Sequence, residues 1–149
     1  MNWCHYRFRS VWKLPAPPDT VYAALAEPDT YPRWWPQVRR AVRLDQHRGV
    51  ARLRSFLPYD ILVTVTEGRS DPHARVLEAA LDGDLEGWLR WTVTADGVDG
   101  ARARYDQEVE VRQPLMRGLA LPGRPFFVAN HALMMRAGRR GLAAHLRGA

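Results

Sequence analysis

The sequence has little cysteine and almost no lysine. Cys4 is its only cysteine, which excludes an intrachain disulfide, a CxxC pair and a zinc site built from several cysteines. Lys13 is the only lysine among 22 basic residues, a bias typical of GC-rich bacterial coding, in which arginine codons are favoured. With no cysteine framework and no secretion signal, we expect a bacterial cytoplasmic protein.

The sequence also lacks long apolar runs and the common cofactor motifs. No window holds 18 uninterrupted apolar residues, so no membrane span is expected. The opening MNWCHYRFRSVWK is charged throughout and has no apolar signal-peptide region. GxGxxG, GxxxxGK[ST], GxSxG and histidine pairs with metal-ligand spacing are absent. We therefore expect no cofactor, no metal site and no hydrolase triad.

What the chain does have is an ordinary globular composition with a basic balance. Its 149 residues are 46% hydrophobic and 26% charged, and we expect residues 1–149 to form a single domain. The net charge of +6 raises the possibility of a nucleic-acid or lipid partner. Three arginine pairs, however, are spaced by two residues: Arg7 and Arg9, Arg52 and Arg54, and Arg102 and Arg104. Such scattered pairs favour the solvated outer face of a sheet, and no nucleic-acid partner is expected.

Alternation of apolar and polar residues predicts most of the secondary structure. Residues 2–14 alternate and end at a proline cluster, which indicates a half-buried strand with Trp12 on its buried face. Short helical segments are predicted over 20–26 and 30–35. Further strands are predicted over 38–44, 50–57, 59–67, 74–81, 85–94 and 101–112.

The C-terminal part of the chain predicts one long helix. Pro122 and Gly123 mark a break, after which residues 126–146 contain no proline and have a helical period. The expected inner stripe consists of Phe127, Asn130 or His131, Met134, Gly138 and Leu142. About 30 Å of helix would cross a sheet of this size.

These elements together predict an α+β helix-grip fold. A curved antiparallel sheet of six to seven strands would surround the long C-terminal helix, with two short helices after the first strand. A curved sheet that grips a helix leaves space between the two, and a ligand would occupy that space.

Three segments also resemble a known family. The stretch WKLPAPPDTVYAALAEPDTYPRWWPQV at 12–38, GDLEGWLRWTV at 83–93 and NHALMMRAGRRGL at 130–142 are similar to the SRPBCC (START-like, helix-grip) superfamily, in particular its bacterial polyketide cyclase/dehydrase-like branch. The resemblance implies a deep pocket for a hydrophobic molecule, such as a polycyclic, acyl or lipid compound.

The same resemblance assigns roles to individual positions. It places Trp35 at the pocket entrance and makes Gln107 and Asn130 its polar positions. Two departures are visible, because Val38 stands where a pocket tyrosine is expected and the strand YDILVTVTE contains no arginine of the kind that aromatase/cyclases use.

Parity and helical period select candidate ligand contacts. Trp91, Tyr105 and Gln107 share the inward faces of the last two strands, and a buried glutamine needs hydrogen-bond partners. The full set of expected ligand-binding residues is Trp35, Val38, Trp91, Tyr105, Gln107, Phe127, Asn130 and Met134.

Three residues are candidates for catalysis, two of them, His131 and Tyr59, for proton transfer. His131 could act as a general base, because the ordinary pKa of histidine lies near 6.5. Tyr59 could donate to a carbonyl and Arg54 could hold an enolate or carboxylate, although its parity predicts an outward side chain.

Three functions follow from these candidates. The first is binding of a small hydrophobic molecule, by a monomer or a homodimer. The second is a polyketide aromatase/cyclase or dehydratase that uses the same cavity. The third is docking of a partner or membrane surface on the arginine-rich outer face.

Overall fold

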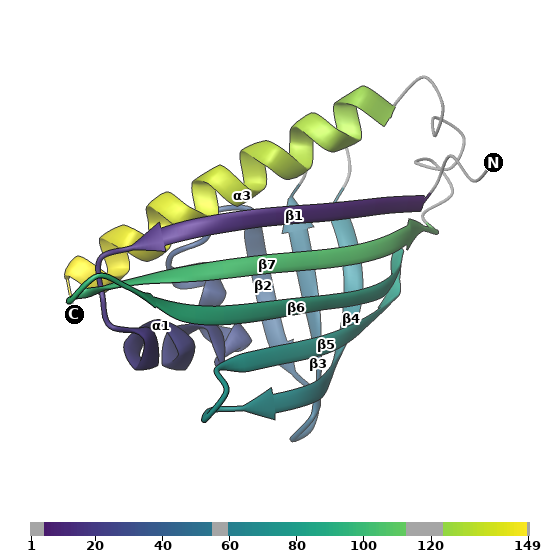
Figure 1. Cartoon of the computed structure of the whole chain (residues 1–149). Coiled ribbons are helices and arrows are strands. Elements are labelled where there is room, and N and C mark those ends of the chain that lie inside the picture. The colour runs from purple at the N-terminus through teal and green to yellow at the C-terminus, as the bar shows by residue number, and fades with distance from the viewer. Residues whose placement is uncertain (1–4, 55–59, 113–123, 149) are drawn as a thin grey trace.

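The computed structural model describes residues 5–54, 60–112 and 124–148 (Figure 1). It contains, in chain order, β1 (His5–Leu14), α1 (Pro18–Leu25), the 3-10 helix η1 (Pro28–Arg33), β2 (Val38–Arg43), β3 (Arg48–Arg54), β4 (Asp60–Asp71), β5 (Val76–Gly83), β6 (Leu85–Asp96), β7 (Gly100–Val111) and α3 (Arg124–Arg147). No helix among these residues is long and apolar enough to cross a membrane.

The seven strands form one antiparallel sheet in the order β1-β7-β6-β5-β4-β3-β2. After β1 the chain passes through α1 and η1 to the opposite edge of the sheet. From there β2 to β7 follow one another as a meander, and β7 returns to pair with β1. This arrangement confirms the predicted helix-grip fold.

The sheet is strongly curved around α3. Figure 1 shows β1, β7 and β6 running nearly along α3, whereas β2, β3 and β4 run across them behind. A register shift between Val38 and Arg40 interrupts the pairing of β2 with β3, and another between Glu67 and Ser70 interrupts the pairing of β4 with β5. Such irregularities bend a strand and increase its twist, which helps the sheet to wrap the helix.

The core divides into two clusters along α3. The larger one gathers around Trp12, Trp35, Trp91 and Leu142, and the smaller one around Tyr6 and Phe127 together with aliphatic residues of β4, β5 and β7. Trp12 is only 2% exposed, which confirms the predicted inward face of β1.

Some element boundaries differ from the predictions. The second helical segment is a 3-10 helix that ends at Arg33, so Trp34 and Trp35 lie beyond it; Pro32 inside the segment removes a backbone donor that an α-helix would need. β4 continues to Asp71, because the bulge after Glu67 lets pairing with β5 resume at Ser70. α3 begins at Arg124, and the expected break at Pro122 and Gly123 lies outside the described residues.

The outer face of the sheet carries acids between its arginines. Asp106 accepts from both Arg9, at 2.8 Å, and Arg104, at 3.0 Å. Arg90 pairs with Glu78 at 2.9 Å. These ion pairs, two of them across strands and the Arg104–Asp106 pair within β7, agree with a solvated outer face rather than a continuous basic stripe.

Candidate functional site

A cavity of about 490 Å³ lies between α3 and the concave face of the sheet. Its volume falls within the range of known small-molecule sites. Side chains of β1, β3 to β7 and α3 line it, together with the segment from α1 to β2. Most of the lining is aliphatic or aromatic, so the cavity suits a largely apolar molecule.

All eight residues expected to bind a ligand line this cavity. Trp91, Tyr105 and Gln107 lie on the concave face of β6 and β7 and are nearly inaccessible to solvent, at 2%, 6% and 6% exposure. The others come from the segment that leads into β2 and from the inner stripe of α3. The complete set is Trp35, Val38, Trp91, Tyr105, Gln107, Phe127, Asn130 and Met134.

The C-terminal half of α3 closes one end of the cavity. A Cβ atom on Gly138 would lie 2.5 Å from Cε2 of Trp35 and 2.8 Å from Cη2 of Trp12, so only glycine allows the helix to approach these rings. The Trp35 indole also donates from Nε1 to the carbonyl oxygen of Met134 at 2.8 Å. Trp35 therefore lines the cavity and also connects the edge of the sheet to α3 through a hydrogen bond.

A polar cluster lies on the lining nearer the N-terminal half of α3. Oε1 of Gln107 accepts a hydrogen bond from the Tyr105 hydroxyl at 2.9 Å and lies 3.0 Å from Nε2 of His131. Because a carbonyl oxygen only accepts, Nε2 of His131 carries the hydrogen. The His131 ring stacks on Phe8, with 3.7 Å between the ring centroids.

Burial changes the ionisation of the titratable groups in this lining. It lowers the pKa of His131 to about 4, so the imidazole is neutral at pH 7. It also raises the pKa of Tyr105 and of Tyr31, although the Trp91 indole opposes the change at Tyr31. The hydroxyl of Tyr31 donates to the carbonyl oxygen of Leu25 at 2.6 Å. The interior polar groups are thus uncharged at neutral pH.

This geometry agrees with the comparison against known families. Residues 6–147 match the family described as polyketide cyclase/dehydrase and lipid transport. The chain belongs to this family. It is a polyketide cyclase-like member of the SRPBCC superfamily, as the sequence segments predicted. None of the curated proteins matches the sequence.

Several solved structures share the fold at low sequence identity. The Zhui aromatase/cyclase from Streptomyces sp. R1128 is 16% identical, with a TM-score of 0.77 over 95% of this chain and 93% of its own. A conserved protein from Geobacillus kaustophilus is 10% identical, with a TM-score of 0.79 over 96% of both chains. A START superfamily protein from Mycobacterium smegmatis is 14% identical, with a TM-score of 0.64 over 88% and 96%.

The three catalytic candidates do not form one group. His131 is in the polar cluster, but its lowered pKa makes it a weak base at neutral pH. Arg54 lies at the end of β3, and its side chain is exposed, as its parity predicted. It is nevertheless part of the lining, at the rim of the cavity. Tyr59 lies outside the described residues.

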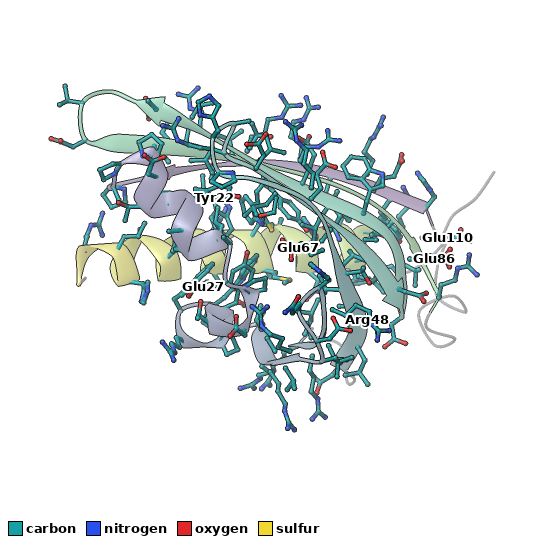
Figure 2. The ribbon with its side chains drawn as sticks, turned by 90° about the horizontal axis from the view of Figure 1, so that it is seen from below. Tyr22, Glu27, Arg48, Glu67, Glu86 and Glu110 are labelled. Atoms are coloured by element: carbon teal, nitrogen blue, oxygen red, sulfur yellow. The ribbon has the colours of Figure 1, made fainter. Side chains whose placement is uncertain are left out.

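Sequence reasoning missed two parts of the lining. Tyr6 and Phe8 line the cavity from β1, and their shared inward parity was the available signal, although parity alone predicts burial rather than contact with a cavity. Apart from Arg54, the charged rim was also missed. There Arg43 pairs with Asp29 at 3.4 Å and His47 lies 3.6 Å from Glu67, which Figure 2 labels.

The described residues contain no group of three or more histidine, cysteine, aspartate or glutamate side chains that could hold a metal ion. The polar cluster supplies hydrogen-bond donors and acceptors. Its donors and acceptors could orient a ligand within the otherwise apolar cavity.

Proposed function

We propose that the protein binds a small hydrophobic molecule, polyketide-like, polycyclic or acyl in character, between α3 and the sheet. The observation that carries the proposal is the cavity of about 490 Å³, which has an apolar lining and one polar cluster. An apolar cavity with a few fixed polar groups is the usual form of a site for such ligands. The family description, which combines polyketide cyclase and lipid transport, supports this choice.

Two observations support binding over proton transfer as the main role. The cationic side chains of Arg43, Arg48 and Arg54, all in the described lining, are exposed at its rim and do not face a buried reacting centre. His131, which is partly buried, has a pKa of about 4 and so holds a proton poorly at pH 7. A cyclase or dehydratase would need a buried group matched to the working pH.

Fluorescence titration with the uncharged dye N-phenyl-1-naphthylamine tests the proposal. We expect saturable binding to the wild-type protein, with a rise in dye emission because the cavity is apolar. Ala51→Phe should weaken the binding, because Ala51 lines the cavity from the middle of β3 and a phenyl ring there would take up part of the space.

Leu62→Phe is the matched control. Leu62 is a neighbour of Ala51 on the paired strand β4, but it is 52% exposed and is not part of the lining. The control should bind the dye as the wild type does. Equal binding by wild type and Ala51→Phe, or no binding by a folded wild type, would contradict the proposal.

A further inference from the structure

One hydrogen-bond acceptor of the polar cluster, Nδ1 of His131, is not used by the bonds within the cluster. Oε1 of Gln107 takes hydrogens from both Tyr105 and His131, so the hydrogen of the His131 ring is on Nε2. A neutral imidazole with its hydrogen on Nε2 has a lone pair on Nδ1. Within residues 5–54, 60–112 and 124–148, Nδ1 of His131 has no hydrogen-bond partner.

The surroundings of His131 hold its ring in place. One face of the ring stacks on Phe8, and its edge is tied to Gln107, which is itself 6% exposed. His131 also lines the cavity from the inner stripe of α3. The free acceptor therefore belongs to a ring that cannot turn away without breaking a hydrogen bond and a stacked contact.

In the described lining, the charged side chains lie away from the interior of the cavity. Its charged side chains Asp29, Arg43, Arg48, Arg54 and Glu67 are all exposed. Glu78, which is half-buried, is paired with Arg90 on the convex face of the sheet. An ionised ligand group placed beside His131 would lose its hydration without gaining an opposite charge, which is costly.

We propose that the cavity selects an uncharged ring ligand that carries a hydroxyl group, such as a phenol or an enol, and that this hydroxyl donates its hydrogen to Nδ1 of His131. The inference rests on the proposed function, because it names the ligand class of the same cavity. His131 acts as a specificity-determining residue, because it favours ligands that carry a hydrogen-bond donor. The neutral state of its ring at pH 7 agrees with this role.

Three naphthalene compounds of similar shape test the inference at pH 7. 2-Naphthol is uncharged and has a donor, 2-methoxynaphthalene lacks the donor, and 2-naphthoate is an anion. For the wild type we expect 2-naphthol to bind about fivefold more tightly than 2-methoxynaphthalene, the usual effect of one net hydrogen bond. 2-Naphthoate should bind at least about tenfold more weakly than 2-naphthol.

Two variants of α3 separate the role of His131 from general effects. His131→Phe keeps an aromatic ring against Phe8 but removes the acceptor. This variant should therefore bind 2-naphthol and 2-methoxynaphthalene with about equal affinity. His145→Phe, at an exposed position on the same helix, should keep the preference. A preference that survives in His131→Phe would overturn the inference.

A measurement on the wild type keeps the inference falsifiable if His131→Phe does not fold. In long-range proton–nitrogen NMR spectra, the Nδ1 resonance of His131 should move when 2-naphthol is added and stay in place with 2-methoxynaphthalene. Equal affinities for these two compounds and an unmoved Nδ1 resonance would overturn the inference while the proposed function stands. Failure of all three compounds and of N-phenyl-1-naphthylamine to bind would overturn both.

Discussion

The two halves of α3 cover the same sheet but leave very different spaces beneath them. Under the C-terminal half, Gly138 and Gly141 let the helix meet Trp34 and Trp35, and Leu142 is fully buried. Under the N-terminal half, Asn130, His131 and Met134 face a cavity. Small residues at one end of the helix thus let it pack directly on the sheet, whereas larger residues at the other end surround a cavity. We call these the packed end and the hollow end.

The largest effect should come from the centre of the packed end. The ring of Trp12 lies 4.8 Å from that of Trp91 and 5.2 Å from that of Trp35, measured between centroids. Trp12→Ala should lower the free energy of unfolding by about 3–5 kcal/mol in denaturant melts. Val11→Ala, on the outward face of the same strand at 48% exposure, should change it by less than about 0.5 kcal/mol. A loss below about 1 kcal/mol for Trp12→Ala would show that this end is not packed as described.

The next effect tests the close approach of the helix. A Cβ atom on Gly141 would fall on the carbonyl oxygen of Trp34, so Gly141→Ala must push α3 away from the sheet edge. We expect a net loss of about 2–3 kcal/mol, measured by thermal or denaturant unfolding, although alanine is the better helix former. Gly148→Ala, where a Cβ would meet only ordinary contacts, should not destabilise the protein. Stabilisation by Gly141→Ala would mean that glycine is not what brings the packed end down onto the sheet.

At the hollow end, His131 should make the free energy of unfolding depend on pH. The pKa of His131 is about 4 in the folded protein and near 6.5 when the chain is unfolded, so the unfolded state binds more protons between these values. The stability contribution of the neutral ring is present above pH 6.5 and is lost as the pH falls towards 4. Between pH 7 and 5 this loss should be about 2 kcal/mol. His131→Phe should lack this component, and the same pH dependence in both proteins would contradict the burial of a neutral His131.

The smallest stability change should come from the cavity wall itself. Met134→Ala removes a side chain that borders the cavity, so we expect the free energy of unfolding to fall by less than about 1 kcal/mol. Leu142→Ala, two turns further along the same stripe and 0% exposed, should cost about 2–5 kcal/mol. Equal losses in the two variants, measured by denaturant melts, would mean that the two ends do not differ in packing.

The strand parts of the site could be predicted from the sequence, because side chains alternate with a period of two. That rule alone assigns Trp91, Tyr105 and Gln107 to the inner face, and the structure places them in the lining. The long helix left Asn130 and His131 as alternatives, because both fall within one broad stripe. Only the structure shows that His131 is the one that bonds to Oε1 of Gln107, because these residues are far apart in the sequence.

The packed end could not be derived in the same way. Gly138 was predicted on the inner stripe, but its contact with Trp35 joins residues that are far apart in the chain. The hydrogen bond from Trp35 to the carbonyl oxygen of Met134 has no local signature either, because every helical residue has a carbonyl group. The charged rim depends on how the β2–β3 hairpin faces η1, which follows from the curvature of the whole sheet.

The central claim is that the hollow end holds a small hydrophobic molecule. Native mass spectrometry of the protein purified from the organism that encodes it tests this claim most directly, with Ala51→Phe purified in the same way as the reference. The account predicts an added mass of a small organic molecule on the wild type, and a smaller bound fraction on Ala51→Phe. A wild-type protein without added mass that also fails to take up N-phenyl-1-naphthylamine, or the same bound fraction on both proteins, would contradict it.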